Sequence, residues 1–176
     1  MAIVAMLFAG TTLSAQTSNI PQRNEIVQVE IDPNSIPSEF LEVFDAPIDG
    51  VHHYYLSVGH LGMGDEVVQI LFDPVFELFI PLGDNVTEAL ETLQTMRALF
   101  KEKQGASIEV QGCLAFGFPT DKLETVKVTY RKVLLSKMLE FSVERESYIR
   151  ATYIAKSDFG SAVSGVKTYH KIHPKQ

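Results

Sequence analysis

The sequence contains a single cysteine, Cys113, and no tryptophan among its 176 residues. One cysteine cannot form a disulfide within the chain, and it excludes zinc modules that depend on several cysteine ligands. No apolar segment reaches the roughly 20 residues that cross a bilayer, so we expect no stable membrane span in the mature protein. Hydrophobic residues nevertheless make up 45% of the chain and charged residues 21%, which is typical of a folded domain with a buried core.

Basic residues are scarce in the first half of the chain. Residues 16–100 carry only Arg23 and Arg97 against fourteen acids, whereas residues 101–176 carry thirteen basic and eight acidic side chains. The net charge of −7 argues against general nucleic-acid binding, because neutralising phosphates requires a basic surface. The split favours attraction between the two halves within one domain. The alternative is that it orients the folded molecule toward a charged partner.

Residues 1–15 are uncharged and begin with an apolar run from Ala2 to Ala9. The run gives way to small and polar residues that end at Ala15, which is small enough for the pocket of a signal peptidase. This pattern predicts a secretory signal peptide over residues 1–15 and a mature chain that begins at Gln16, although no basic residue precedes the apolar run. A buried N-terminal strand or helix is the alternative. We therefore expect an exported protein, either periplasmic or secreted.

The rest of the chain is predicted to form one domain over residues 25–176, after a flexible, polar N-terminus over residues 16–24. Apolar and polar residues alternate over 25–31, which indicates a half-buried strand. Prolines then interrupt the chain, and within this connection we expect one short helical turn over residues 38–44, capped by Ser38.

Most of the remaining segments have the composition of strands. Residues 53–58 and 67–72 predict a hairpin joined by a glycine-rich connection, and the short apolar run over 75–80 predicts a covered strand. Short connections between the later strands make neighbours antiparallel. These later strands are expected at residues 108–118, 125–135, 137–144 and 148–155.

A long helix is the most clearly patterned element and is expected over about residues 85–103. Asp84 or Asn85 can cap its first turn, and the acidic Glu88 suits the exposed amides there. Gly105 follows at the position where a left-handed residue commonly ends a helix.

A C-terminal helix is expected over about residues 158–172, capped by Ser157. Glycine and serine residues from Gly160 to Gly165 are poor helix formers, and their presence indicates close packing against the sheet or a helix that is loose without a partner. Together the elements predict an α+β fold, in which the two helices pack on a predominantly antiparallel curved sheet of about seven or eight strands.

One loop is the candidate contact site. It opens into a strand and has no following lysine, so a hairpin loop is favoured over a phosphate-binding loop, which would open into a helix. Its glycines and its apolar residues suit a contact loop that binds another molecule. The loop consists of Gly59, His60, Leu61, Gly62, Met63, Gly64 and Asp65.

Histidine supplies the only cluster with potential chemistry. His170 and His173 lie three residues apart, but cations at a helix C-terminus explain them without a metal. His52 and His53 would point to opposite faces of a strand and cannot easily share a metal. Cys113 lies in an alternating strand without a basic neighbour, which favours a buried, unreactive thiol. We predict no metal, no cofactor and no catalytic residue.

Three functions are compatible with the sequence. The first is an exported, non-enzymatic domain that binds an envelope or extracellular protein through its sheet or through the loop at 59–65. The second is a carrier that holds a small apolar ligand between the sheet and the long helix. The third, and the least favoured, is a hydrolase centred on His52, His53 or His60.

Overall fold

The computed structural model describes residues 22–32, 39–60, 77–145 and 148–174. Eight strands form one sheet in which the spatial order is the order along the chain, and each strand runs antiparallel to the next. The predicted α+β class and antiparallel sheet are therefore confirmed. The strands are β1 (Asn24–Asp32), β2 (Glu39–Asp45), β3 (Tyr54–His60), β4 (Glu77–Gly83), β5 (Ser107–Ala115), β6 (Glu124–Val133), β7 (Ser136–Arg145) and β8 (Tyr148–Ala155).

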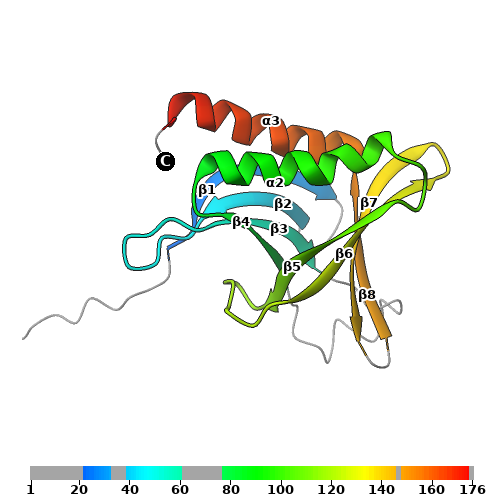
Figure 1. The fold of residues 1–176 in the computed structure, drawn as a ribbon, viewed down its shortest axis with the longest axis horizontal. Helices are drawn as coiled ribbons and strands as arrows, with labels where there is room; N and C mark the ends of the chain where they lie inside the picture. Colours follow the sequence, from blue (N-terminus) through cyan, green and yellow to red (C-terminus); the bar gives the residue numbers. More distant parts are fainter. Residues whose placement is uncertain (1–21, 33–38, 61–76, 146–147, 175–176) are drawn as a thin grey trace, which may run out of the picture.

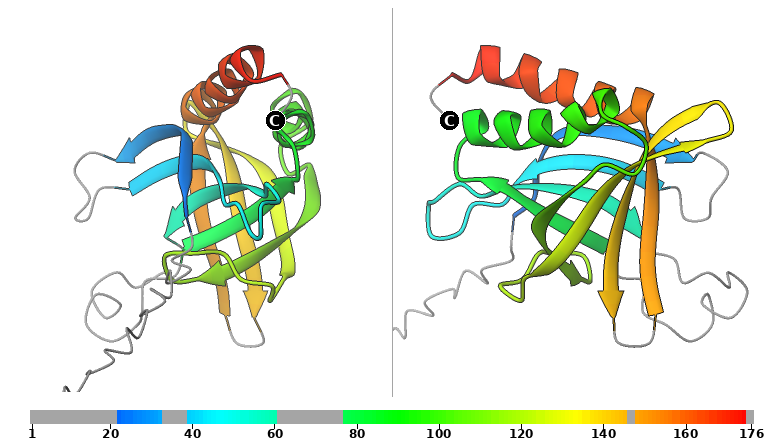
Figure 2. Two further views of the ribbon diagram at one scale, coloured as in Figure 1. Left: turned by 90° about the vertical axis from the view of Figure 1, so that its left-hand side faces the viewer. Right: turned by 45° about the vertical axis from the view of Figure 1, so that its right-hand side comes forward.

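Two helices lie side by side across one face of this sheet (Figures 1 and 2). They are α2 (Val86–Ala98), which continues into the short 3₁₀ helix η1 (Leu99–Lys101), and α3 (Lys156–Ile172). Beneath the helices the sheet curls back on itself, so that β8 contacts β3 (Figure 2). We call the face that carries the helices the inner face and the opposite face the outer face.

The hydrophobic core fills the space between the inner face and the helices. Alternate residues along each strand point inward, and the helices contribute one apolar stripe each, as the periodicity predicts. The largest fully buried side chains include Leu41, Leu56, Ile80, Phe141 and Phe159. This packing leaves the other set of strand residues on the outer face, where the polar side chains gather.

The start of α2 follows the sequence prediction closely. Asn85 is the N-cap, and its Oδ1 accepts a hydrogen bond from the backbone N–H of Glu88 at 2.9 Å. Glu88 in turn accepts one from the backbone N–H of Asp84 at 2.9 Å, which completes a reciprocal cap. Gly105 adopts φ +89° beyond η1, as expected for the residue that ends this helical segment.

The expected helical turn over residues 38–44 is wrong, because β2 occupies Glu39–Asp45. Leu41 and Val43 point into the main core, whereas Phe44 is buried on the outer face beside Phe79. Both faces of β2 are covered here, so the apolar residues do not show the simple alternation that marks a half-buried strand.

The first turn of α3 also differs from the prediction. The helix begins at Lys156 with Ala155 at the N-cap, and Ser157 lies inside the first turn, where its hydroxyl donates to Oδ1 of Asp158 at 3.0 Å. The strand expected over 67–72 lies outside the described residues. None of the described helices is long and apolar enough to span a bilayer.

Candidate functional site

A hollow of about 480 Å³ lies on the outer face over β5, β6 and β7. It forms because the strands alternate, which sends the apolar residues Val126, Val128 and Phe141 into the core and their polar neighbours outward. The side chains and backbone that line it are those of Gly105, Glu109, Glu124, Thr125, Lys127, Thr129, Arg131, Glu140, Ser142 and Glu144.

Cross-strand register brings these residues together in rows. One row runs across the sheet through Glu109, Lys127 and Ser142, which are direct partners on β5, β6 and β7. In the next row Thr129 faces Glu140, which faces Tyr153 on β8. Side chains directly opposite each other in an antiparallel pair lie close enough to interact. The rows therefore build a continuous polar surface from residues far apart in the sequence.

Arg131 and Glu140 form an ion pair with two hydrogen bonds on this surface. Nε and one terminal nitrogen of Arg131 donate to the two carboxylate oxygens of Glu140 at 2.9 and 3.1 Å. The hydrogen bonds from Arg131 hold the pKa of Glu140 below its ordinary value, and burial of Glu140 opposes this shift only in part. Burial and the nearby Glu140 raise the pKa of Tyr153. The guanidinium of Arg131 is therefore already paired with a carboxylate of the protein itself.

Two hydroxyl groups lie beneath the charged rim. The side chain of Ser142 donates to the backbone carbonyl of Lys127 at 3.3 Å. Oγ1 of Thr129 is buried and has no hydrogen-bond partner among the described residues. Because buried polar groups are usually hydrogen-bonded, an unpartnered hydroxyl next to a hollow indicates a position where a bound molecule or water can complete the network.

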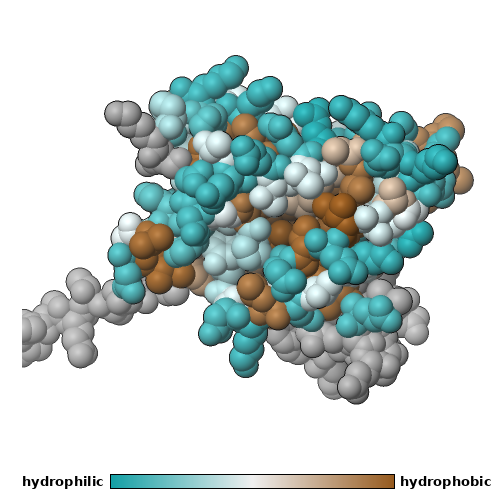
Figure 3. Space-filling view, in the orientation of Figure 1, coloured by the Kyte–Doolittle hydropathy of each residue, from teal (hydrophilic) through white to brown (hydrophobic). Residues whose placement is uncertain are grey.

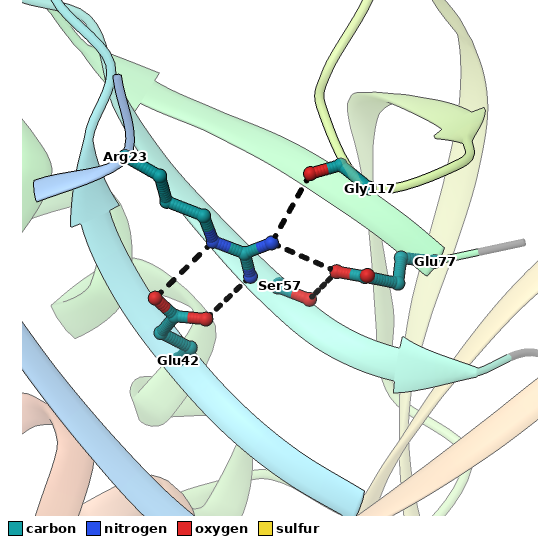
Figure 4. Close-up of polar contacts among 5 residues, drawn as sticks. All are labelled: Arg23, Glu42, Ser57, Glu77 and Gly117. Atoms are coloured by element: carbon teal, nitrogen blue, oxygen red, sulfur yellow. Dashed lines mark hydrogen bonds and ion pairs between the residues drawn. The ribbon is translucent and has the colours of Figure 1, made fainter. Parts of the chain in front are cut away.

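A second polar cluster holds the start of β1 against the outer face (Figure 4). The guanidinium of Arg23 donates to both carboxylate oxygens of Glu42, to Glu77 at 3.2 Å and to the backbone carbonyl of Gly117 at 3.4 Å. Ser57 also donates to Glu77, at 3.2 Å. Burial raises the pKa of Glu42, and the positive charge of Arg23 offsets only part of that rise.

Aromatic rings lie directly beneath this cluster. The guanidinium carbon of Arg23 is 4.2 Å from the ring centroid of Phe44 and 5.5 Å from that of Phe79. These rings belong to a small buried cluster on the outer face that also contains Cys113. Four of the five N–H groups of Arg23 donate hydrogen bonds within the protein, so its role is to fix the N-terminal strand rather than to bind a ligand.

The histidines expected to form the only reactive cluster are separated along β3 and the segment before it, and His60 is the strand partner of Glu77 in the Arg23 cluster. Nδ1 of His52 is 2.7 Å from Oδ2 of Asp45, and Nδ1 of His53 is 2.8 Å from Oδ1 of Asp84. His60 is the last residue of β3, which begins just after His52 and His53, so the three do not form one site. In the described part of the chain, no serine, threonine or cysteine side chain bonds to His52 or His53.

The pair formed by Asp45 and His52 adjoins a buried phenol. Asp45 is the strand partner of Tyr54, and both Oδ1 of Asp45 and the hydroxyl of Tyr54 are buried without a hydrogen-bond partner among the described residues. Burial, followed by the charge of Asp45 and by Tyr169, raises the pKa of Tyr54 to about 12. Tyr54 therefore stays protonated at neutral pH, and its buried position keeps it from a substrate.

The structure also describes Cys113 and part of the predicted contact loop. Cys113 is buried as expected, burial raises the pKa of its thiol, and its sulfur accepts the backbone N–H of Thr120 at 3.4 Å. Gly59 has φ +77° within β3, while residues 61–65 of the candidate contact loop lie outside the described residues. Among the residues that the structure describes, no group of three or more His, Cys, Asp or Glu side chains is placed to hold a metal ion.

Sequence reasoning did not single out the residues of the hollow, although their signal is visible. Polar residues occupy every second position over 125–131 and 140–144. That pattern indicates a solvent-exposed face on each strand but does not show which strands lie side by side. Comparison with family models, with curated proteins and with solved structures gave no match.

Proposed function

We propose that the protein is an exported binding domain that holds a polar, positively charged ligand in the hollow over β5, β6 and β7. The observation that carries this proposal is the charge of the lining, where four carboxylates face two basic side chains. Arg131 is already paired with Glu140, and Glu124 also interacts within the protein, which leaves Lys127 beside Glu109 and Glu144. A surface with this charge balance attracts cations and repels anions.

The hydrogen-bonding groups of the hollow point to a primary ammonium group on the ligand. An ammonium has three N–H donors and therefore needs several acceptors around it. Carboxylate oxygens at the rim and the hydroxyl oxygen of Thr129 beneath them supply such acceptors. A free polyamine and a lysine side chain of an envelope protein share this chemistry, and the experiment below separates the two sources.

The interior of the fold supports a binding site on the surface rather than a carrier of apolar ligands. Side chains from the strands and from both helices occupy the space between them, and the largest of these are less than 2% exposed. A carrier would need that space for its ligand. The hollow on the outer face is therefore favoured as the binding site over the space between the sheet and the helices.

Binding can be tested by calorimetry with spermidine, a trilysine peptide, neutral maltotriose and anionic citrate. We expect spermidine and trilysine to bind, and added salt to weaken both because the hollow is open to solvent. Stronger binding of trilysine than of spermidine would identify a peptide segment as the source of the ammonium group. Binding of maltotriose or citrate in preference to the cations would overturn the proposal.

Two matched double variants distinguish the effect of carboxylates at the rim of the hollow from the effect of the protein's overall charge. Replacing Glu109 and Glu144 with glutamine should weaken binding of the cations by about tenfold, since each exposed ion pair contributes up to about 1 kcal/mol. Replacing Glu91 and Asp121, which are exposed and do not line the hollow, with their amides removes the same charge and should leave binding unchanged. Equal losses in both variants would contradict a localised site.

The export part of the proposal rests on residues 1–15, which lie outside the described residues. When the full chain is expressed in a bacterium, we expect the exported protein to begin at Gln16, as measured by N-terminal sequencing. A Leu7→Arg variant places a charge in the apolar run and should keep the uncleaved chain inside the cell. An exported protein that begins at Met1 would contradict the prediction.

A further inference from the structure

The hairpin between β6 and β7 ends in an exposed apolar tip, formed by Val133, Leu134 and Leu135. Their exposed fractions are 48%, 91% and 94%, and the two leucines are the most exposed large hydrophobic residues in the described part of the chain. The hairpin projects from one end of the molecule (Figure 1), and apolar atoms stand out at that end in the space-filling view (Figure 3). A soluble fold alone gives no reason to place two leucines in water at this point.

The turn at the tip is also poorly suited to its residues. Val133 and Ser136 are strand partners, so Leu134 and Leu135 form a two-residue connection, and Leu134 has φ +54°. Turns of this length favour glycine, asparagine or aspartate because a branched side chain is strained at positive φ. The same protein uses Asp49 and Gly50, at φ +51° and +80°, in its β2–β3 hairpin. A leucine at positive φ is a strained choice, and a function of its side chain at the tip would explain it.

Lysines directly behind the tip add a second local cost. Lys132 and Lys137 are direct strand partners, and both side chains are exposed. Like charges directly opposite each other in an antiparallel pair destabilise it. Both unfavourable features, the exposed leucines and the paired lysines, become favourable against a surface that is apolar inside and negatively charged at its boundary.

Other segments bring further lysines to the same end of the molecule. Gly105 and Ala106 exchange backbone hydrogen bonds with Tyr130, each at 2.9 Å, which places the turn after η1 beside β6. Lys156 follows Ala155, the strand partner of Met138. The resulting lysine collar consists of the exposed side chains of Lys101, Lys103, Lys132, Lys137 and Lys156.

The collar keeps a positive balance. Glu102 lies between Lys101 and Lys103, and Asp158 lies in the first turn of α3 with Lys156. Nearby Arg131 is neutralised by Glu140 and does not contribute. The excess of basic residues after residue 100 therefore has a defined location, at the base of the apolar tip.

We propose that this end of the protein docks on an anionic lipid bilayer, with the apolar tip inserted below the headgroups and the lysine collar at their level. Leucine side chains gain free energy by entering hydrocarbon, and lysines near an anionic surface each add to the attraction while their stems lie along the boundary. A protein partner fits the tip less well, because three residues on a narrow hairpin offer far less than the roughly 1,000 Å² of a specific interface. The proposal is independent of the ligand in the outer hollow.

Because the chain has no tryptophan, the fluorescence of a single introduced tryptophan reports the environment of the tip alone. A Leu135→Trp variant of the full chain carries a single indole at the tip, and a Phe116→Trp variant carries one at another highly exposed apolar position, 77% exposed, away from the collar. With vesicles of equal parts phosphatidylcholine and phosphatidylglycerol, we expect the emission of the tip indole to shift to the blue and that of the control to stay unchanged. The readout is local, so attachment of the chain through residues 1–15 alone would not produce it.

The collar and the tip are tested separately. In the Leu135→Trp variant, replacing Lys132 and Lys137 with glutamine should raise the lipid concentration needed for half the shift by roughly tenfold or more, because each lysine contributes about 1 kcal/mol near an anionic surface. Replacing Lys122 and Lys167 with glutamine, which lie outside the collar and remove equal charge, should have little effect.

A tip variant also separates binding from folding. Leu134→Gly with Leu135→Asn gives the turn residues that this geometry prefers, so the unfolding midpoint should stay the same or rise. In the full chain with the indole readout at Val133→Trp, the same two changes should raise the lipid concentration needed for half the blue shift with the anionic vesicles at least about tenfold.

Three results would overturn the proposal. The first is no blue shift of the tip indole with anionic vesicles. The second is an equal shift with vesicles of phosphatidylcholine alone, which would remove the role of the lysine collar. The third is a shift that depends on protein concentration without lipid, which would show that the apolar tip docks on a second copy of this chain.

Discussion

Replacement of Arg23 with methionine is expected to lower the free energy of unfolding by about 2–3 kcal/mol. The change keeps a long side chain over Phe44 and Phe79 but leaves the largely buried carboxylate of Glu42 without its cation. Breaking a buried ion pair costs about 3–5 kcal/mol and an exposed pair at most about 1 kcal/mol, and the side chain of Arg23 is 25% exposed. Urea denaturation at neutral pH measures the difference.

The deficit of this variant should shrink as the pH falls. Burial already raises the pKa of Glu42 in the folded protein, and loss of the positive charge of Arg23 raises it further. A carboxyl group with a raised folded pKa binds a proton more readily when folded, so its contribution to stability increases as the pH is lowered through that pKa. Unfolding measured between about pH 7 and pH 5 should therefore show partial recovery of the variant relative to the unchanged protein.

Two controls test whether the ion pair is the cause. Arg97 is the other basic residue of the acidic half, and it is exposed on α2, so Arg97→Met should change the free energy of unfolding by less than about 0.5 kcal/mol. Adding Glu42→Gln to Arg23→Met removes the uncompensated charge and should restore part of the stability. A deficit that is independent of pH and unaffected by Glu42→Gln would contradict the assignment.

The glycines of α3 are expected to respond in opposite directions to the same substitution. A Cβ atom at Gly165 would lie 2.5 Å from Cγ2 and 2.9 Å from Cβ of Val27, whereas a Cβ atom at Gly160 would meet nothing within 4 Å. Gly165→Ala should therefore lower the free energy of unfolding by about 1–2 kcal/mol, because the overlap outweighs the better helix propensity of alanine. Gly160→Ala should raise it by up to about 1 kcal/mol.

Thermal unfolding of the two single variants provides the comparison, and each is the control for the other. Val27→Ala removes Cγ2, the atom nearest to the new Cβ, but keeps Cβ at 2.9 Å, so the cost of Gly165→Ala should fall only in part in that background. An equal gain in stability from both alanines would show that α3 does not depend on close contact with β1 at this position.

Gly160 and Gly165 show what can and what cannot be predicted from the sequence. The run of small residues after Ser157 predicted either close packing of the last helix on the sheet or a helix that is loose without a partner, and Gly165 against Val27 shows close packing at one position. The sequence could not distinguish Gly165 from Gly160, because only the docking angle of α3 decides which glycine faces β1. Local propensity carries no information about that angle.

The error at β2 has a related cause. Residues 38–44 contain apolar side chains that suit one helical turn as well as a strand covered on both faces, since period-two alternation disappears when both faces are buried. Phe44 is placed on the outer face by Phe79 from β4 and by the guanidinium of Arg23. Those contacts join segments more than 20 residues apart, and no pattern within the segment reveals them.

The polar hollow and the apolar tip show the same division between local and long-range information. Alternating polar residues on β6 and β7 indicated wet strand faces, but the cross-strand register brought Glu109, Lys127 and Ser142 into one row. The sequence predicted one strand over residues 125–135, which includes Leu134 and Leu135 at its end. The hairpin places both in solvent, because the strand pairing closes at Val133 and Ser136.

By itself, the sequence determined the class of fold, the long capped helix, most strands, the burial of Cys113 and the excess of lysine after residue 100. These features depend on periodicity, capping and composition, which act over a few neighbouring residues or over the whole chain. Only the tertiary structure decided which polar residues share the outer hollow, which lysines surround the apolar tip and what neutralises Arg23. Those relations depend on strand register and helix docking, which the packing of distant segments sets.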